Sequence, residues 1–394
     1  MSSRQAISLV KGGPACTRRA GKLIVLIAFA GALAVTTTTL TGETPSSSSR
    51  QTIKAIYIPL ADHYAIIVAH EKYRDKMKYA ELQIEQFSGP HLIRPRFREG
   101  DIDIACTVCP QAMDMFLKKP NFRWISLMHR DGNALAINDL LNAEVQLPDK
   151  WIDRKPDDKV ANAFVIAKKE LGRPTECGVP HLQATHTVVL YKYLKDHGKT
   201  LTLGYGDADI VAIEVPPPES PSFIKRKNSR NEAASFEQSL PWADVVETGG
   251  YGHVAWYSKD VIPWPNGHVE CIAIATDECI KNKRIALQEV IYYIHKAGLD
   301  IEFARRAGGE DMIAIAEMIR RHIPEHNKEA IIQSLRPDLM VINYQHLNLD
   351  KKGLKVIMDL AVDGGILKEK IDIEAFADTS FSTRITDQPL NLKD

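Results

Sequence analysis

Residues 100–113 constrain the fold most, because they predict a strand, a tight loop and a helix in direct succession. A short apolar run at 102–105 follows a Gly-Asp turn, and apolar residues recur at helical spacing after Pro110. Proline suits the first position of a helix, so the sequence predicts that Cys109 is the N-cap. Unpaired backbone N–H groups at this helix start could bind an anion or lower the pKa of the thiol.

Apolar segments on both sides of this stretch predict an α/β fold. We expect strands at 53–60, 82–87 and 122–128, with helical patterns between the strands. Such a β-α-β-α-β-α-β series is typical of a parallel sheet with helices on both faces. Ligands of open α/β sheets collect at the carboxyl ends of strands, which places Asp62 and the loop before Pro110 at a candidate site.

The second half of the chain predicts a second α/β lobe and a return to the first. A polar, proline-containing segment at 138–158 interrupts the first series. The strands expected after it are at 176–179, 211–215, 253–257 and 269–275, and the expected helices are at 164–171, 181–197, 285–297, 311–322, 328–335 and 354–362. The return to the first lobe is expected near Ala275.

The bulk composition excludes some classes of protein. The chain has 394 residues, a formal net charge of +0 and 44% hydrophobic residues, so we expect a folded protein of about two domains. A balanced charge gives no electrostatic footprint for nucleic acid, and the sequence has no zinc-finger or basic-heptad pattern. We therefore expect no nucleic-acid partner.

The N-terminus predicts an export signal. Basic residues that include Lys11, Arg18, Arg19 and Lys22 precede an apolar run at 23–35, which contains the small-residue triplet Ala-Leu-Ala. The run is shorter than the roughly 20 residues that span a bilayer, so we interpret 1–35 as a secretory signal peptide, with a membrane anchor as the alternative. The Thr/Ser-rich tract at 36–51 is interpreted as a flexible linker. A periplasmic or extracytoplasmic location follows, with Sec and twin-arginine export both left open.

An odd number of cysteines remains after the predicted cleavage, namely Cys106, Cys109, Cys177, Cys271 and Cys279. At least one thiol is then free, shared between chains or bound to a ligand. Cys106 and Cys109 form a C-x-x-C pair, for which a small-loop disulfide, a redox pair and a metal site all stay open. A metal would need further ligands, such as Asp62, His63, His186 or Cys271.

Several short motifs occur in an order that resembles a known family, and they span nearly all of the chain after the predicted signal. They are Ile58-Pro59-Leu60 before a helix, Gly100-Asp101-Ile102-Asp103 before a loop with Pro110, Val179-Pro180-His181 with Thr185-His186, Pro241-Trp242, and the closing Gly364-Gly365-Ile366-Leu367, Ile371-Asp372 and Phe376. The chain is thereby similar to the nitrate/sulfonate/bicarbonate family of periplasmic substrate-binding proteins of ABC transporters. Two departures bear on the ligand: Leu240 replaces a glutamate of the family pattern, and cysteines replace small apolar residues at 106 and 109.

The resemblance implies a two-lobe periplasmic binding protein type II fold, α/β in class, with mixed or parallel sheets, helices on both faces and two crossovers that form a hinge. Lobe 1 is then expected at 52–138 plus 275–394, and lobe 2 at 139–274. The implied function is to close the two lobes around a small solute, anionic or containing sulfur or nitrogen, and to deliver the solute to a permease.

The resemblance also implies a monomer that is not an enzyme, with no catalytic residues, no cofactor and no bound metal. Because no Walker sequence occurs in the chain, the ATPase of the transporter, like its permease, is expected to be a separate chain. Contact with a membrane would come only through the signal peptide or the permease. Two alternatives stay open: a metal-dependent or thiamin-pyrimidine-synthase-like enzyme on the same fold, and a solute sensor for a membrane receptor.

The predicted ligand-binding residues lie at strand ends and helix starts of both lobes. They are Asp62, His63, Thr107, Cys109, Thr185, His186 and Trp242, with Cys106, His253 and Tyr257 as further candidates. Hydroxyl and imidazole groups beside a helix start can hold an anion. A structural interpretation stays open for several of them, with Asp62 as a helix cap and Trp242 as a core aromatic.

Overall fold

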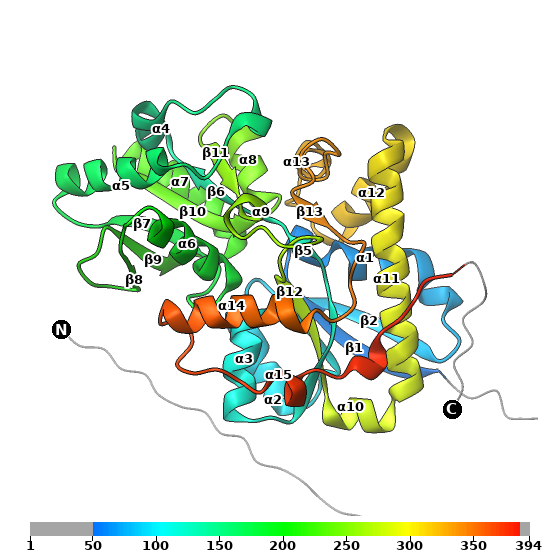
Figure 1. Cartoon of the computed structure of the whole chain (residues 1–394). Coiled ribbons are helices and arrows are strands. Elements are labelled where there is room, and N and C mark those ends of the chain that lie inside the picture. Colours follow the sequence, from blue (N-terminus) through cyan, green and yellow to red (C-terminus); the bar gives the residue numbers. More distant parts are fainter. Residues whose placement is uncertain (1–49, 387–394) are drawn as a thin grey trace, which may run out of the picture. The chain divides into compact units, whose positions relative to one another are not determined.

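The first sheet contains five strands in the order β2-β1-β3-β12-β4. β1, β2 and β12 of this sheet are labelled in Figure 1. The computed structural model describes residues 50–386. The strands are β1 (Gln51–Tyr57), β2 (Ala80–Gln86), β3 (Ile104–Val108), β4 (Phe122–Leu127) and β12 (Cys271–Thr276). β1 pairs in parallel with β2 and β3, whereas β12 runs antiparallel to β3 and β4. The sheet is therefore mixed, because β12 comes from the second half of the chain and separates β3 from β4.

The second sheet contains six strands in the order β11-β6-β10-β7-β9-β8. They are β6 (Asn133–Ile137), β7 (Thr175–Val179), β8 (Leu201–Leu203), β9 (Ile210–Glu214), β10 (Ala234–Ser239) and β11 (His253–Tyr257). β10, β7, β9 and β8 run parallel, and β6 is antiparallel to both β10 and β11. A short ladder of β5 (Arg130–Asp131) with β13 (Ile342–Asn343) lies outside both sheets. The predicted α/β class with mixed and parallel sheets is confirmed.

The chain passes between the two sheets twice. It leaves the first sheet after β4 to enter the second at β6, and it returns from β11 to β12. These two stretches, residues 128–132 and 258–270, are the crossing segments. β6 thus belongs to the second sheet and β12 to the first. The predicted lobe bounds, 52–138 plus 275–394 and 139–274, remain a prediction.

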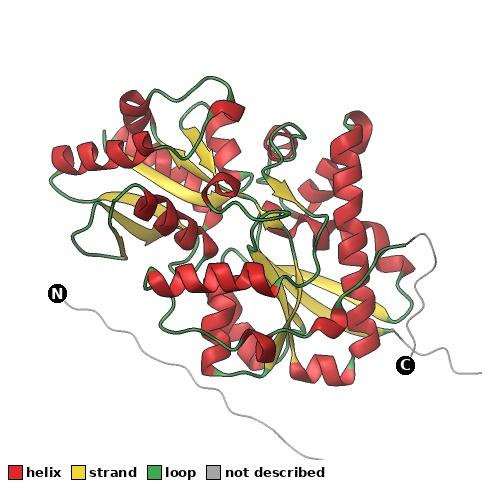
Figure 2. Ribbon diagram, in the orientation of Figure 1, coloured by secondary structure: helices red, strands yellow, loops and turns green. Residues whose placement is uncertain are grey.

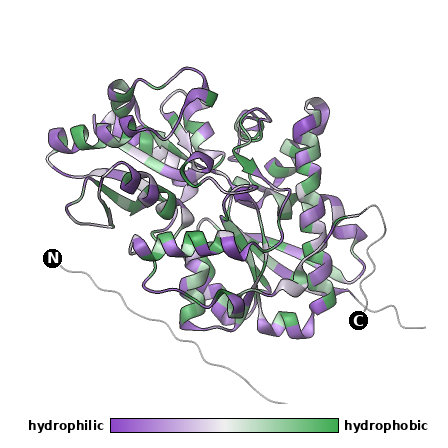
Figure 3. Ribbon diagram, in the orientation of Figure 1, coloured by the Kyte–Doolittle hydropathy of each residue, from purple (hydrophilic) through white to green (hydrophobic). Residues whose placement is uncertain are grey.

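Helices flank the strands of both sheets (Figure 2). α1 (Tyr64–Tyr73), α11 (Arg284–Ala307) and α12 (Gly309–His322) pack against one another, and α11 also contacts β1 and β2. α14 (Lys351–Asp363) contacts α3 (Cys109–Lys118) and α6 (Thr185–Asp196), which follow strands of the first and second sheets respectively. α11 and α14 each contain both hydrophobic and hydrophilic residues, as expected for helices with one buried face (Figure 3).

The other α-helices are shorter than α11, and none of the helices within residues 50–386 has the length and apolar character needed to cross a membrane. They are α2 (Ile93–Glu99), α4 (Asp139–Val145), α5 (Asp158–Leu171), α7 (Ser220–Ser229), α8 (Trp242–Thr248), α9 (Ser258–Val261), α10 (Asp277–Asn282), α13 (Lys328–Ser334) and α15 (Ile373–Phe376). The predicted signal peptide, and nearly all of the predicted linker, lie outside the described residues.

One glycine of α11 permits a close backbone contact. A Cβ atom added at Gly298 would lie 2.7 Å from the backbone oxygen of Tyr344 and 3.1 Å from its Cβ. We therefore expect Gly298→Ala to lower the free energy of unfolding by about 1–3 kcal/mol through overpacking, although alanine favours a helix. Urea unfolding measures the change. The exposed Arg306 on the same helix supplies a control, since Arg306→Ala should stay within about 0.5 kcal/mol of the wild type. Equal stability of the two variants would contradict the expected steric conflict.

Candidate functional site

Asp62 is fully buried at the carboxyl end of β1, in the short 3-10 helix η1 (Ala61–His63). Its Oδ2 accepts a hydrogen bond of 2.8 Å from the hydroxyl of Ser239, at the end of β10, and one of 3.2 Å from the thiol of Cys271, at the start of β12. Neither η1 nor α1 has a side-chain cap hydrogen bond, so the interpretation of Asp62 as a helix cap is wrong. Asp62 instead links the first sheet to the second.

His129, in the first crossing segment, completes the surroundings of Asp62. Its Nε2 lies 3.4 Å from Asp62 Oδ2, yet neither ring nitrogen of this fully buried side chain has a hydrogen-bond partner. Burial by itself would raise the pKa of Asp62, but the nearby imidazole of His129 outweighs burial and holds this pKa below its usual range. Asp62 is therefore an ionised carboxylate within the protein interior.

A second contact group lies next to Asp62 and contains His186 and Glu270. His186 is the second residue of α6, and its Nε2 is 2.7 Å from the Ser239 hydroxyl. Its Nδ1 lies 3.3 Å from Oε1 of Glu270, which is in the second crossing segment. Burial lowers the pKa of His186 to about 3, so the imidazole is neutral. Burial and then the charge of Asp62 raise the pKa of Glu270 well above its usual range.

The starts of α3 and α6 meet at this cluster. Cys109 is the first residue of α3 and Val108 is its N-cap, so the prediction that Cys109 is the N-cap is wrong. α6 begins at Thr185 and not at 181, because a turn follows β7. The Cys109 sulfur lies 3.4 Å from the Thr185 hydroxyl, and the backbone oxygen of Glu270 accepts from the backbone N–H of Cys109 and from that hydroxyl.

The cysteines do not form the disulfide that the C-x-x-C pair left open. All five cysteines within residues 50–386 are free and buried, and the Cys106 sulfur lies 3.7 Å from the sulfur of Met128. Burial, and then the nearby Glu270, raise the pKa of Cys109 well above its usual range. The lowered thiol pKa that a helix start could produce is therefore absent at Cys109.

The other predicted site residues form their hydrogen bonds outside this cluster, although His63 lies beside Asp62. The His63 ring bonds back to the backbone of Ile58, Thr107 donates to Gln111 Oε1, and Trp242 donates to the backbone oxygen of Pro59. Two further candidates lie on β11, where half-buried His253 bonds to Asp139 and buried Tyr257 has a hydroxyl without a hydrogen-bond partner. Their roles as ligand contacts remain predictions.

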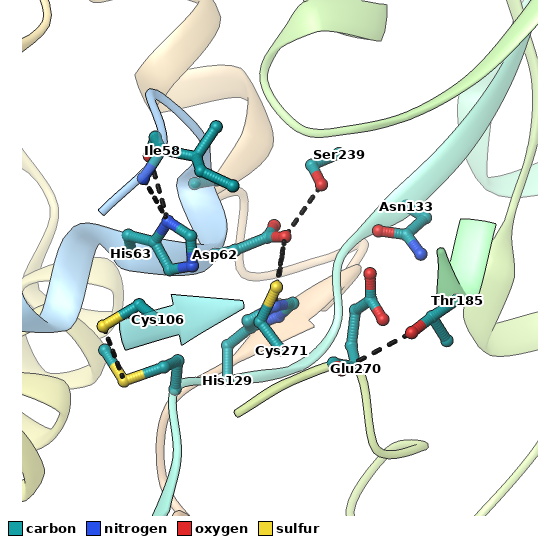
Figure 4. Close-up of polar contacts among 12 residues, drawn as sticks. Ile58, Asp62, His63, Cys106, His129, Asn133, Thr185, Ser239, Glu270 and Cys271 are labelled. Carbon is teal, nitrogen blue, oxygen red and sulfur yellow. Dashed lines mark hydrogen bonds and ion pairs between the residues drawn. The ribbon is translucent and has the colours of Figure 1, made fainter. Parts of the chain in front are cut away.

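Sequence reasoning missed four polar residues of the cluster. Ser239 ends β10, Asn133 begins β6, and His129 and Glu270 lie in the crossing segments. Figure 4 shows Asp62, Cys271 and Ser239 in contact, with Glu270, Asn133 and Thr185 beside them. A polar residue that directly follows a predicted strand, as His129 follows β4, is the signal that could have identified part of this set.

Comparison with known proteins identifies the fold and the family. A sequence profile of the NMT1-like family matches residues 47–315, and no curated protein sequence matches the chain. The periplasmic nitrate-binding protein NrtA from Synechocystis PCC 6803 is 15% identical, with a TM-score of 0.69 over 84% of this chain and 87% of that chain. The ligand-binding component of an ABC-type import system from Staphylococcus aureus, with zinc bound, is 17% identical, with a TM-score of 0.64 over 84% and 98%.

A third solved structure has the same fold. The periplasmic aliphatic sulphonate-binding protein SsuA from Escherichia coli is 10% identical, with a TM-score of 0.59 over 88% of this chain and 97% of that chain. At these identities the structures show the periplasmic binding protein fold, which confirms the predicted fold class. Together with the profile match they also confirm the resemblance to the nitrate/sulfonate/bicarbonate group. The chain belongs to the NMT1-like family.

Proposed function

We propose that this chain is an extracytoplasmic solute-binding protein of an ABC transporter. The observation that carries the proposal is the buried polar cluster, which draws Asp62 and Cys271 from the first sheet, Ser239 and His186 from the second, and Glu270 from a crossing segment. Ligand sites favour interfaces of this kind, because relative motion of the two sides opens and closes them.

The two crossing segments are the proposed hinge. Each is short compared with the lobes expected at 52–138 plus 275–394 and at 139–274. Bending at residues 128–132 and 258–270 would separate Asp62 from Ser239 and Cys109 from Thr185, and so open the cluster to solvent. Small-angle X-ray scattering should then show a smaller radius of gyration with solute than without it.

The proposed partners are a permease and an ATPase, each a separate chain, and the binding protein itself is a monomer exported by its N-terminal segment. The expectation that it is not an enzyme stays a prediction. Cys271 does not resemble a nucleophile, because burial and then the charges of Asp62 and Glu270 raise its pKa well above the usual range, whereas catalytic cysteines have a lowered pKa. A sensor would use the same solute site, and a neighbouring sensor-kinase gene would favour that role.

Thermal unfolding with a panel of solutes tests the proposal. Oxyanions, sulfonates, pyrimidines, amines and metal salts are added to the solute-free chain, and the matching class should raise the melting temperature by mass action. Ser239→Ala removes the hydroxyl that contacts Asp62 and His186, so we expect binding at least tenfold weaker. Ser126→Ala, at an equally buried serine that contacts His295, should bind as the wild type does. If no class raises the melting temperature and no solute is retained after purification, solute binding is refuted.

A further inference from the structure

We infer that the solute is a divalent transition-metal ion, bound by Asp62, His129 and Cys271, with His186 or Glu270 supplying a fourth ligand. This inference rests on the proposed function, because it assigns the ligand of the same buried cluster. It replaces the solute expected from the sequence, anionic or containing sulfur or nitrogen, with a cation, and it needs no residue outside the described part of the chain.

The separations between the ligand atoms fit a single ion. Cys271 Sγ and His129 Nε2 lie 3.2 and 3.4 Å from Asp62 Oδ2, and the ligand atoms of these three residues all lie within 4.8 Å of one another. Zinc-type ions bind sulfur at about 2.3 Å and nitrogen or oxygen at about 2.0–2.2 Å, which places tetrahedral ligands about 3.3–3.6 Å apart. Asp62, His186 and Glu270 form a second group that meets the same 4.8 Å criterion. The two groups share Asp62, so a fourth ligand can come from His186 or Glu270, which lie beside Asp62.

Several nitrogen and oxygen atoms of the cluster that could bind a metal form no hydrogen bond. Both ring nitrogens of His129, Nδ1 of His186, Oδ1 of Asp62 and both carboxylate oxygens of Glu270 are buried without a hydrogen-bond partner. Buried polar atoms in native proteins are normally paired. These unpaired atoms lie close together, at the distances that separate the ligands of one metal ion, but they do not form hydrogen bonds with one another (Figure 4). This arrangement indicates that an ion bound by several of them is their common partner.

The orientation of His186 leaves one nitrogen free to bind a metal. Ser239 donates its hydroxyl proton to Asp62, so the hydrogen bond between Ser239 and His186 must be donated by Nε2 of the imidazole. In a neutral imidazole the other nitrogen then carries a lone pair. That nitrogen, Nδ1, is the atom 3.3 Å from Glu270 Oε1, and its fixed orientation is typical of histidines that bind metals.

The side chains of the cluster favour a cation over an anion. Asp62, Glu237 and Glu270 are fully buried, and within residues 50–386 none of the three forms an ion pair with a lysine or arginine. An oxyanion would meet the carboxylate of Asp62 with no arginine or lysine to offset its charge, whereas a divalent cation would be attracted to it. A bound cation would also favour the ionised form of Glu270. Thiolate and imidazole ligands select zinc-like ions over magnesium or calcium, which prefer oxygen ligands. Binding breaks the S–H bond of Cys271, forms a metal–sulfur bond and releases the proton to solvent.

Cobalt and zinc titrations of the chelator-treated full chain test the inference. We expect one tightly bound ion per chain, a thiolate-to-cobalt charge-transfer absorption, and a raised melting temperature. Cys271→Ser should abolish the charge-transfer absorption and weaken zinc binding at least tenfold. Cys279→Ser should change neither, since that buried thiol lies on α10 near Asp103 and Lys283. His129→Ala gives a second variant without the Cys271 substitution, and the melting temperature of each metal-free variant shows whether it folds.

The outcomes separate this inference from the proposed function. His70, Glu71 and His322 form another group that could hold an ion, so His322→Ala is included, and binding lost with His322→Ala but kept in Cys271→Ser would overturn the assignment. No bound ion, or a Cys271→Ser chain that binds cobalt as the wild type does, would also overturn it. If no metal ion binds, but an oxyanion or an amine binds the wild type and binds Ser239→Ala more weakly, the metal inference is refuted and the solute-binding function stands. If no compound of any class binds, both are refuted.

Discussion

Replacing Glu289 with alanine is expected to lower the free energy of unfolding by about 3–6 kcal/mol. Glu289 lies on α11 and is 2% exposed. Its carboxylate accepts three backbone hydrogen bonds where the chain enters β2, from the N–H groups of Lys78 (2.8 Å), Tyr79 (2.7 Å) and Ala80 (2.9 Å). A backbone donor left unpaired in the interior costs about 1–3 kcal/mol. Alanine would remove the acceptor of the buried Ala80 N–H and of the partly buried Lys78 and Tyr79 N–H groups, and the cost of these two lies near the lower end because water can reach them.

Urea unfolding of three variants separates the lost hydrogen bonds from the loss of a charge. Glu289→Gln keeps one carbonyl oxygen as an acceptor, so its loss of stability should be intermediate. Glu317→Ala is the matched control, because Glu317 is a half-exposed helical glutamate 3.3 Å from Arg320, and such surface pairs contribute less than about 1 kcal/mol. A Glu289→Ala chain as stable as the control would show that water replaces the carboxylate at the start of β2.

The strands that the sequence predicts well are those with continuous apolar runs. β11 is found at its predicted bounds, and β1 and β4 begin within two residues of theirs. β10 was not predicted, because its sequence A-S-F-E-Q-S contains buried polar residues, including Glu237 and Gln238, and shows no alternation. Hydrophobic periodicity identifies strands whose side chains are apolar. It fails where a strand places polar side chains beside a buried site.

Part of the candidate site follows from the sequence and part requires the tertiary structure. Asp62 and His186 were placed by rules for strand ends and helix starts, and the structure brings them to the same hydroxyl of Ser239. His129 and Glu270 lie in the crossing segments, whose approach to Asp62 depends on how two sheets pack. The charge of the site could not be predicted either, because a chain with a net charge of +0 gives no sign that carboxylates gather in its interior.

Acidification should lower the contribution of His295 to the free energy of unfolding, because the folded protein buries this side chain as a neutral imidazole. His295 on α11 bonds through Nε2 to the Ser126 hydroxyl at 2.9 Å, and burial lowers its pKa from 6.5 to about 4. Between these two pH values the unfolded chain binds a proton that the folded chain does not. The contribution is therefore fully present above pH 6.5 and is lost as the pH falls toward 4. At about 1.4 kcal/mol per pH unit, the loss between pH 7 and pH 5 is about 2 kcal/mol.

The difference between the wild type and His295→Gln isolates this histidine, because every other group titrates equally in both proteins. Such a control is needed because burial raises the pKa values of Glu237, Asp244 and Glu270. Their contribution to the free energy of unfolding therefore increases as the pH falls, opposite to that of His295. Urea unfolding should show the wild type's advantage over His295→Gln shrinking by about 2 kcal/mol from pH 7 to pH 5. The same comparison with His346→Gln, at an exposed histidine, is the matched control. An advantage that stays constant would mean that His295 takes up its proton without unfolding, so that water reaches the space between α11 and β4.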